Sequence, residues 1–253
     1  MSLHYEATGD GPPLVFVHGL GSSARDWEKQ LPAFRDRYRV VTFDVRGHGR
    51  SDKPPGPYGI SQFARDTAAL IEHLGCAPAH VAGVSMGGMI ALQLAADRPD
   101  LVRSLAVVNS TPAAPVCGWR SRWRWRLRRL LVRVLGMRAV GWVLGRRLFP
   151  DDEHLRREFA RRWAENDHRA YLASMRAIEG WSVRERLPEI QHPTLVLTAE
   201  HDYTSPAHKR AYAARMPDAR VVVIPEARHG LPVGRPRAFN EALASFLDEV
   251  AGQ

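Results

Sequence analysis

Short apolar runs alternate with longer segments of helical periodicity along this chain. Six runs are almost continuously apolar, as strands buried on both faces of a parallel sheet are. Between these runs, apolar positions recur at helical spacing in four segments, with Asp or Ser near their starts. The alternation predicts βαβ units with right-handed crossovers. The predicted strands are residues 14–17, 39–43, 80–84, 104–108, 194–198 and 220–224, and the predicted helices are residues 61–74, 86–97, 206–216 and 236–250.

Residues 113–187 interrupt this alternation, because they contain several amphipathic helical patterns and no predicted strand before the sheet resumes. We expect one α/β core domain built from residues 1–112 and 188–253. Residues 113–187 then form an Arg- and Trp-rich helical cap, or lid, over the carboxyl edge of the sheet. A length of 253 residues is enough to fill one large core.

The net charge of +9 is concentrated in the insertion. Residues 113–187 hold 18 Arg and 8 Asp or Glu, a balance of +10. The rest of the chain holds 18 basic and 19 acidic residues, a balance of −1. The charge therefore describes the cap, and the core is close to neutral.

Cysteine content and hydropathy predict where in the cell the protein is found. Cys76 and Cys117 are too few for a disulfide scaffold and have no metal-ligand spacing. The first ten residues lack the basic start of a secretory signal, and no apolar run reaches the roughly 18 residues of a membrane span. We expect a cytoplasmic protein with no structural metal and no cofactor.

The strongest chemical motif is Gly83-Val84-Ser85-Met86-Gly87, at a predicted strand-to-helix turn. Glycines two positions on either side of a serine let the backbone make a strained turn without Cβ clashes. The turn projects the hydroxyl of Ser85 at a helix N-terminus. The pattern alone is weak, but its position between a strand and a helix favours a nucleophile.

A serine nucleophile needs a general base, and the base needs an acceptor that fixes its tautomer. Asp202 follows the strand at 194–198, and His229 follows the next strand. The order Ser, Asp, His in loops after successive strands indicates a catalytic triad. The simpler alternative makes Asp202 a helix cap and His229 a surface residue. Glu200 is a weaker candidate for the acid, and Asn109 cannot carry the charge.

Acyl transfer also needs donors for the oxyanion. The backbone N–H groups of Leu20 and Met86 are the candidates. Leu20 follows His18-Gly19 in the loop after the first parallel strand, and Met86 follows the nucleophile. The simpler interpretation of His18-Gly19 is a plain turn.

With these motifs, the chain resembles the α/β-hydrolase superfamily over nearly its whole length. The similarity is to small esterases, enol-lactonases and cofactor-free haloperoxidase-like or C–C-bond hydrolases. It implies a mostly parallel central sheet flanked by helices, with a helical cap inserted after the sixth strand, and makes residues 44–51 a structural turn. The segments that carry it are residues 16–19, 44–52, 83–88 and the His229 loop leading to Pro236.

Two further expectations come from the resemblance. Haloalkane dehalogenases and epoxide hydrolases of this fold use Asp where this chain has Ser85, so those reactions are disfavoured. The family usually begins with an antiparallel hairpin, but only residues 3–7 are available before Gly9. We expect the first strand of that hairpin to be missing and a sheet edge to be exposed.

The insertion allows several interpretations. Trp123, Leu127, Leu130, Leu131 and Val134 share one helical face, with Arg120, Arg124 and Arg128 on the other side. The favoured interpretation is a cap whose apolar stripe covers the active site, with Trp123, Leu127 and Leu131 contacting substrate. A second is an interfacial helix on anionic lipid, which would imply lipid-like acyl substrates. A third interpretation is that the arginines pair with an anionic group of the substrate or with an acidic partner. Nucleic-acid binding is the least favoured, because no recognised binding motif accompanies the charge.

The sequence therefore predicts a serine hydrolase that cleaves carboxylic esters of small molecules through an acyl-enzyme. Enol-lactone opening and C–C cleavage on the same triad are the alternatives. A ligand- or membrane-binding protein that retains the fold without turnover is the alternative from another class.

Overall fold

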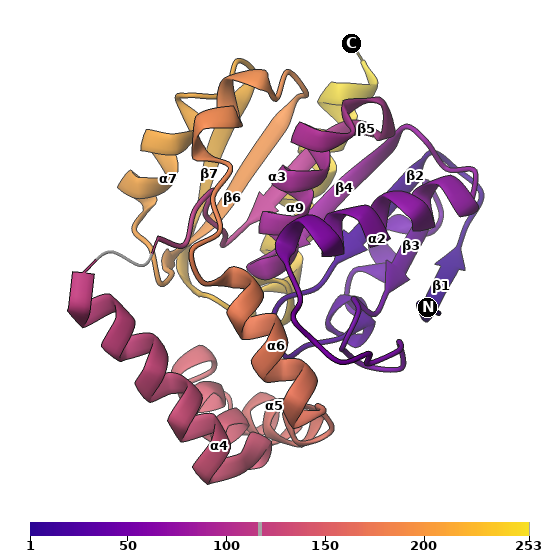
Figure 1. The fold of residues 1–253 in the computed structure, drawn as a ribbon. Helices are drawn as coiled ribbons and strands as arrows, with labels where there is room; N and C mark the ends of the chain where they lie inside the picture. Colours follow the sequence, from indigo (N-terminus) through magenta and orange to yellow (C-terminus); the bar gives the residue numbers. More distant parts are fainter. Residues whose placement is uncertain (116–117, 253) are drawn as a thin grey trace.

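The computed structural model describes residues 1–115 and 118–252, except for the side chains of residues 120, 121, 124 and 128. Its centre is a seven-stranded sheet in the order β1-β3-β2-β4-β5-β6-β7, parallel except for β1 (Figure 1). All six predicted strands are confirmed, and the last two extend further along the chain than predicted. The strands are β1 (Tyr5–Thr8), β2 (Pro13–Val17), β3 (Arg39–Phe43), β4 (Ala79–Val84), β5 (Val102–Val108), β6 (Thr194–His201) and β7 (Ala219–Arg228).

Strand β1 forms one edge of the sheet. It pairs antiparallel with β3, from Tyr5 opposite Phe43 to Thr8 opposite Val40. All four of its residues are exposed, and within the described residues no other strand pairs with it. Among the described residues β1 is therefore an edge strand, and the edge that it exposes is short.

Helices cover both faces of the sheet, as Figure 1 shows. One face carries α2 (Ile60–His73), α3 (Met86–Asp97) and α7 (Pro206–Ala213). The other carries α1 (Leu31–Phe34), α8 (Leu231–Gly234) and α9 (Pro236–Ala251). The four predicted helices are confirmed, although α7 ends three residues earlier than expected. The short helix α1 and the 3-10 turn at Ala24–Trp27 were not predicted.

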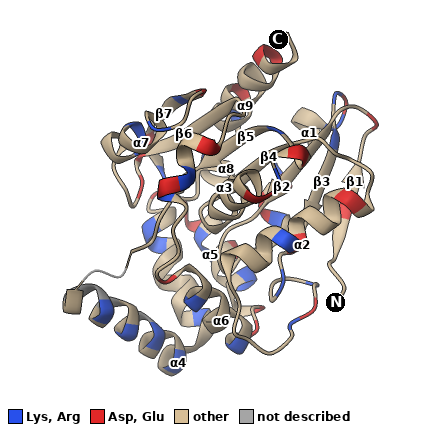
Figure 2. Ribbon diagram, turned by 45° about the horizontal axis from the view of Figure 1, so that its top comes forward, with Lys and Arg blue, Asp and Glu red and all other residues tan. Residues whose placement is uncertain are grey.

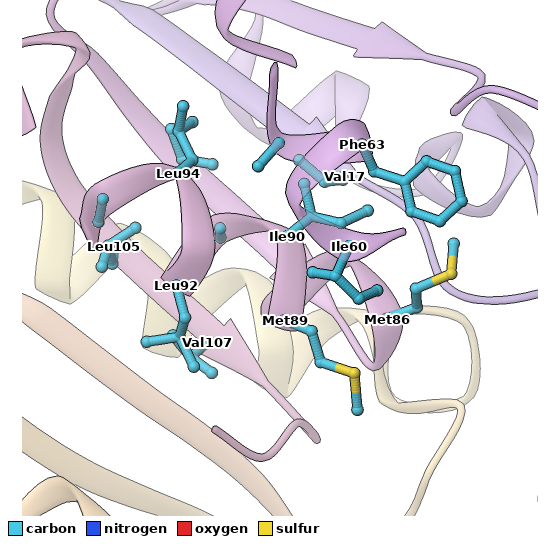
Figure 3. Close-up of a cluster of buried hydrophobic side chains, with 14 of the residues drawn as sticks. Val17, Ile60, Phe63, Met86, Met89, Ile90, Leu92, Leu94, Leu105 and Val107 are labelled. Atoms are coloured by element: carbon cyan, nitrogen blue, oxygen red, sulfur yellow. The ribbon is translucent and has the colours of Figure 1, made fainter. Parts of the chain in front are cut away.

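The apolar core lies between the sheet and these helices. Figure 3 shows part of it, where α3 side chains such as Ile90 gather with Phe63 of α2 and Leu105 of β5. These three side chains are completely buried. Full burial stabilises each such side chain by about 1.5–3 kcal/mol relative to exposure. The core therefore holds the carboxyl ends of the strands rigidly in place.

Three helices follow β5: α4 (Gly118–Leu148), α5 (Glu153–Ala164) and α6 (His168–Ile178). Asp152 and Asp167 cap α5 and α6 by accepting backbone N–H groups, as helix N-caps commonly do. The segment follows the fifth strand and not the sixth, because a single strand precedes β2 in the sequence. Non-helical angles at Gly136 (φ 72°, ψ 169°) break α4 into two arms.

The two ends of this helical segment are joined to each other. Ala113 and Ser182 form an isolated antiparallel bridge, and the N–H of Ala114 donates to the carbonyl of Trp181 at 2.9 Å. The indole of Trp181 in turn donates to Gln93 of α3 at 2.8 Å. Cys117 lies outside the described residues. Among those described, no helix is both long enough and apolar enough to cross a membrane.

Candidate active site

Ser85 occupies a sharp turn between β4 and α3. Its backbone has φ 56° and ψ −115°, an unusual conformation for a residue other than glycine. A Cβ on Gly83 would lie 2.2 Å from the carbonyl oxygen of Gly87, and a Cβ on Gly87 would lie 2.0 Å from that of Val17. Both positions therefore require glycine, as the motif predicts.

The structure brings Ser85, His229 and Asp202 together. The Oγ of Ser85 lies 3.0 Å from Nε2 of His229, and Nδ1 of His229 lies 2.5 Å from Oδ1 of Asp202. Asp202 directly follows β6 and His229 directly follows β7, so parallel strands deliver both to the edge where β4 ends. This arrangement can move a proton from the hydroxyl to an imidazole that a carboxylate orients.

The simpler interpretations of these residues do not fit the contacts. Ser205, and not Asp202, caps α7 by accepting the N–H of His208. Glu200 accepts the backbone N–H of Glu226 at 2.9 Å instead of contacting the imidazole. Asp202 is thus the carboxylate that holds His229.

A buried lysine lies beside Asp202. The Nζ of Lys209 is 2.9 Å from Oδ2 of Asp202 and donates to the carbonyl of Ser110 at 2.7 Å and to Oγ1 of Thr204 at 2.5 Å. Both charged side chains are 1% exposed. Burial alone would raise the pKa of Asp202, but the hydrogen bond from His229 and the charge of Lys209 hold that pKa well below its usual range. Burial lowers the pKa of Lys209, against the opposing effect of Asp202.

Residues after β5 connect the three loops. The side chain of Asn109 donates to the carbonyl of His229 at 2.9 Å and accepts the N–H of Ala199 at 2.8 Å. The hydroxyl of Ser110 donates to the carbonyl of Ser85 at 2.6 Å. Asn109, which could not serve as the acid, is therefore a structural link between the ends of β5, β6 and β7.

The loop after β2 lies against the serine. A Cβ on Gly19 would be 3.4 Å from the Cβ of Ser85. Nε2 of His18 accepts the N–H of Val45 at 2.9 Å, so its Nδ1 carries the proton and donates to the carbonyl of Gly19 at 2.8 Å. His18 thereby fixes the peptide that joins Gly19 to Leu20. Met86 is the first residue of α3, so its N–H has no acceptor within the helix.

The turn at residues 44–51 is structural, as the resemblance implies. The carboxylate of Asp44 accepts the N–H of Ala24 at 2.8 Å and that of Arg50 at 2.7 Å. Gly49 has φ +48°, and a Cβ there would lie 2.2 Å from Oδ2 of Asp44. Neighbouring His48 packs edge-on against His18 at 5.1 Å, and burial lowers the pKa of His48 to about 3.

A cavity of about 260 Å³ opens at Ser85 and His229. Trp125, Leu144 and Trp163 of the helical segment line it together with Leu20 and Tyr203. No Lys or Arg is among the described residues that line it. Asp26 is there, and burial raises the pKa of its carboxyl. In the described part of the chain, no group of three His, Cys, Asp or Glu could hold a metal ion.

Three residues expected to contact substrate lie elsewhere. Trp123, Leu127 and Leu131 are 60%, 41% and 45% exposed, and none of them lines the cavity. The helical face that turns inward is the one that carries Trp125 and Val132. The expectation that the apolar stripe covers the site is therefore wrong, because that stripe lies on the outer side of α4.

Sequence reasoning missed Lys209, Trp125 and Tyr203. Lys209 sits in an ordinary amphipathic helix, where lysine usually indicates solvent. Trp125 was passed over in favour of the neighbouring stripe. Tyr203 stacks on the imidazole of His229, with ring centroids 4.1 Å apart; its position directly after Asp202 was an available signal.

Comparisons with known proteins agree with this geometry. The chain is 32% identical to the RutD protein of Azorhizobium caulinodans, whose name proposes a carbamate hydrolase, over 98% of this chain and 96% of that protein. It is 30% identical to 3-oxoadipate enol-lactonase 2 of Acinetobacter baylyi, over 98% and 93%. The structure of a thermophilic esterase from Thermogutta terrifontis superposes with a TM-score of 0.89 at 27% identity, covering 98% and 93%. The profile of the alpha/beta hydrolase fold matches residues 12–236, and the chain belongs to this family.

Proposed function

We propose that the protein is a serine hydrolase that cleaves carboxylic esters through an acyl-enzyme. The observation that carries this proposal is the continuous contact from Ser85 Oγ through His229 to Asp202 at the floor of an apolar cavity. A serine hydroxyl is a poor nucleophile at neutral pH, and such a contact is what activates it.

The proposed reaction has two halves. Ser85 Oγ attacks the ester carbonyl while His229 takes its proton, and the N–H groups of Leu20 and Met86 stabilise the oxyanion. His229 then protonates the departing alcohol, leaving the acyl group on Ser85. Water attacks this acyl group with His229 again as the base, and the carboxylic acid leaves as the serine regains its proton. Asp202 holds the imidazole throughout.

The lining of the cavity supports a neutral substrate with an apolar acyl group. A substrate that carries a carboxylate, as 3-oxoadipate enol-lactone does, needs a cation or several donors to replace its hydration. The described lining offers no Lys or Arg and places Asp26 there instead. Ester hydrolysis is therefore favoured over enol-lactone opening and C–C cleavage of acidic substrates. Carbamate cleavage, the activity in the relative's name, uses the same attack on a carbonyl.

The test compares wild type with Ser85→Ala on p-nitrophenyl esters of increasing acyl length, an enol-lactone and a simple carbamate. We expect ester hydrolysis by the wild type and a loss of at least about 10⁴-fold in kcat/KM for the variant. Undiminished hydrolysis by Ser85→Ala would refute the assignment of the nucleophile. Faster turnover of the enol-lactone than of any ester would refute the substrate class.

A further inference from the structure

The outer face of α4 is apolar and uncovered. Trp125 and Val132 turn inward, and at 100° per residue the opposite side of the helix carries Trp123, Leu127 and Val134. Their exposed fractions of 60%, 41% and 71% are unusual for a continuous apolar stripe. We define the outer face as Trp123, Leu127, Leu130, Leu131 and Val134, all of which are exposed.

Arginines border this face. Helix α4 contains ten Arg and no Asp or Glu, and Figure 2 shows the basic residues recurring along its length. Arg122, Arg126 and Arg133 are exposed and lie together on one flank, between the outer face and the buried side. An apolar face with arginines along its edge is the arrangement of a helix that lies in the headgroup region of a bilayer.

A groove lies beside the outer face and shares lining residues with the active-site cavity. A cavity of about 470 Å³ lies at the bend of α4, with Leu131 of the outer face and Leu135 in its wall. Leu144 and Tyr203 line both this groove and the cavity at Ser85. Apart from Arg147, which lies over the ring of Tyr203, the wall of the groove is apolar, so an apolar chain that enters at the outer face can follow it to the ring stacked on the imidazole.

We propose that the outer face of α4 docks on an anionic lipid surface and that the groove admits an acyl chain from that surface to Ser85. The second half of this inference rests on the proposed esterase function. A second copy of the chain is a poorer occupant, because it would bring two arginine-rich helices together. Nucleic acid is poorer too, since phosphates would meet an apolar centre before the arginines.

The binding experiment uses the full chain with Ser85→Ala, so that hydrolysis does not alter the lipid. Co-sedimentation is measured with vesicles of phosphatidylcholine alone and of phosphatidylcholine mixed with phosphatidylglycerol, at low and at high salt. We expect binding to the phosphatidylglycerol vesicles that weakens with salt, and little binding to phosphatidylcholine.

Two triple variants test the two parts of the surface, and a third is the charge-matched control. Arg122→Gln, Arg126→Gln and Arg133→Gln together should weaken vesicle binding by about 100-fold. Arg35→Gln, Arg65→Gln and Arg237→Gln make the same charge change elsewhere and should retain most of the binding. Trp123→Ser, Leu127→Ser and Val134→Ser leave the charge unchanged and should weaken binding by at least about tenfold. Circular dichroism verifies that each variant is folded.

Several results would overturn the docking inference. One is no sedimentation with phosphatidylglycerol vesicles at low salt. Another is unchanged vesicle binding by the triple variant Trp123→Ser, Leu127→Ser and Val134→Ser. A third is tighter binding to duplex DNA than to the vesicles. The outer face would instead belong to an interface with a second copy if the protein formed concentration-dependent dimers and did not bind vesicles, and if the triple variant of Trp123, Leu127 and Val134 abolished those dimers. Hydrolysis of a soluble p-nitrophenyl ester by the wild type is measured alongside. Intact hydrolysis with failed binding refutes the docking and leaves the esterase function standing. Binding without hydrolysis refutes the esterase function and the acyl-chain route that rests on it, and leaves the docking standing.

Discussion

At the carboxyl edge of the sheet, the polar groups of Asp202, Lys209 and Asn109 each have buried partners, whereas the outer face of α4 exposes apolar side chains beside arginines. In the first region, buried ion pairs and hydrogen bonds connect the loops to one another. The second has no packing partner among the described residues on its outer side. Under the proposed function, we expect the carboxyl edge of the sheet to set the chemistry and the helical segment to select what reaches it.

The largest expected effect comes from changing the carboxylate that contacts His229 at the carboxyl edge of the sheet. Asp202→Asn keeps the shape of the side chain but favours the wrong tautomer of His229, so kcat/KM for a p-nitrophenyl ester should fall by about 10⁴-fold. Glu200→Gln is the control and should retain activity, because Glu200 contacts a backbone N–H instead. A loss with Glu200→Gln and not with Asp202→Asn would move the acid to position 200.

The next effect compares the ion pair at the carboxyl edge of the sheet with one between α4 and the end of α6. Lys209→Met leaves the carboxylate of Asp202 and the carbonyl of Ser110 without their buried cation, so the free energy of unfolding should fall by about 3 kcal/mol. Arg129→Met removes the cap pair with Glu179, which is partly exposed, and should cost about 1 kcal/mol or less. Urea titration measures both. Equal losses would contradict the contrast between the regions.

Removing Lys209 should also alter the pH profile. Without the cation, one of the charges that lower the pKa of Asp202 is lost, so the carboxylate that orients His229 is protonated at higher pH and the acidic limb of kcat/KM should move to higher pH. Thr204→Val, which removes one acceptor of Lys209 but keeps its charge, is the milder variant if Lys209→Met does not fold. It should leave the limb in place.

A smaller effect concerns acid stability of the core. Burial lowers the pKa of His48 to about 3 and of His80 to about 4. Between pH 6.5 and about 4 the unfolded chain therefore binds protons that the folded chain does not, and stability falls as the pH falls. Each histidine contributes about 1.4 kcal/mol per pH unit. In urea titrations, His80→Gln should reduce this slope, whereas exposed His154→Gln should leave it unchanged.

The smallest expected effect distinguishes the inner and outer faces of α4. Trp125→Ala enlarges the cavity at Ser85 and should raise KM for longer acyl esters about tenfold. Trp123→Ala, two residues away on the outer face, should leave KM for soluble esters unchanged. The acyl-length series measures both. The reverse result would show that the stripe, and not Trp125, faces the substrate.

The fold and the contact between the three triad side chains could be predicted because they depend on local sequence patterns. Apolar runs mark buried strands, and the carboxyl ends of parallel strands share one edge, so Ser85, Asp202 and His229 could be placed together. Gly83 and Gly87 follow from the backbone turn alone. These features require no knowledge of how distant surfaces pack.

The orientation of α4 could not be predicted in the same way. A helical wheel shows that Trp123 and Trp125 lie on different faces, but not which face turns inward. That choice depends on the contacts of Val132 and Trp125 with α6 and on the bend at Gly136. Lys209 was missed for a related reason, since its burial results from the loop at Ser110, about a hundred residues earlier in the chain.

The proposed function requires that His229 makes the hydroxyl of Ser85 nucleophilic. Mass spectrometry of the protein after treatment with a fluorophosphonate measures this directly, because only an activated serine reacts readily. We expect one adduct, located on Ser85, and its loss in His229→Gln. No adduct on the wild type, or an adduct on Ser85 that persists in His229→Gln, would contradict it.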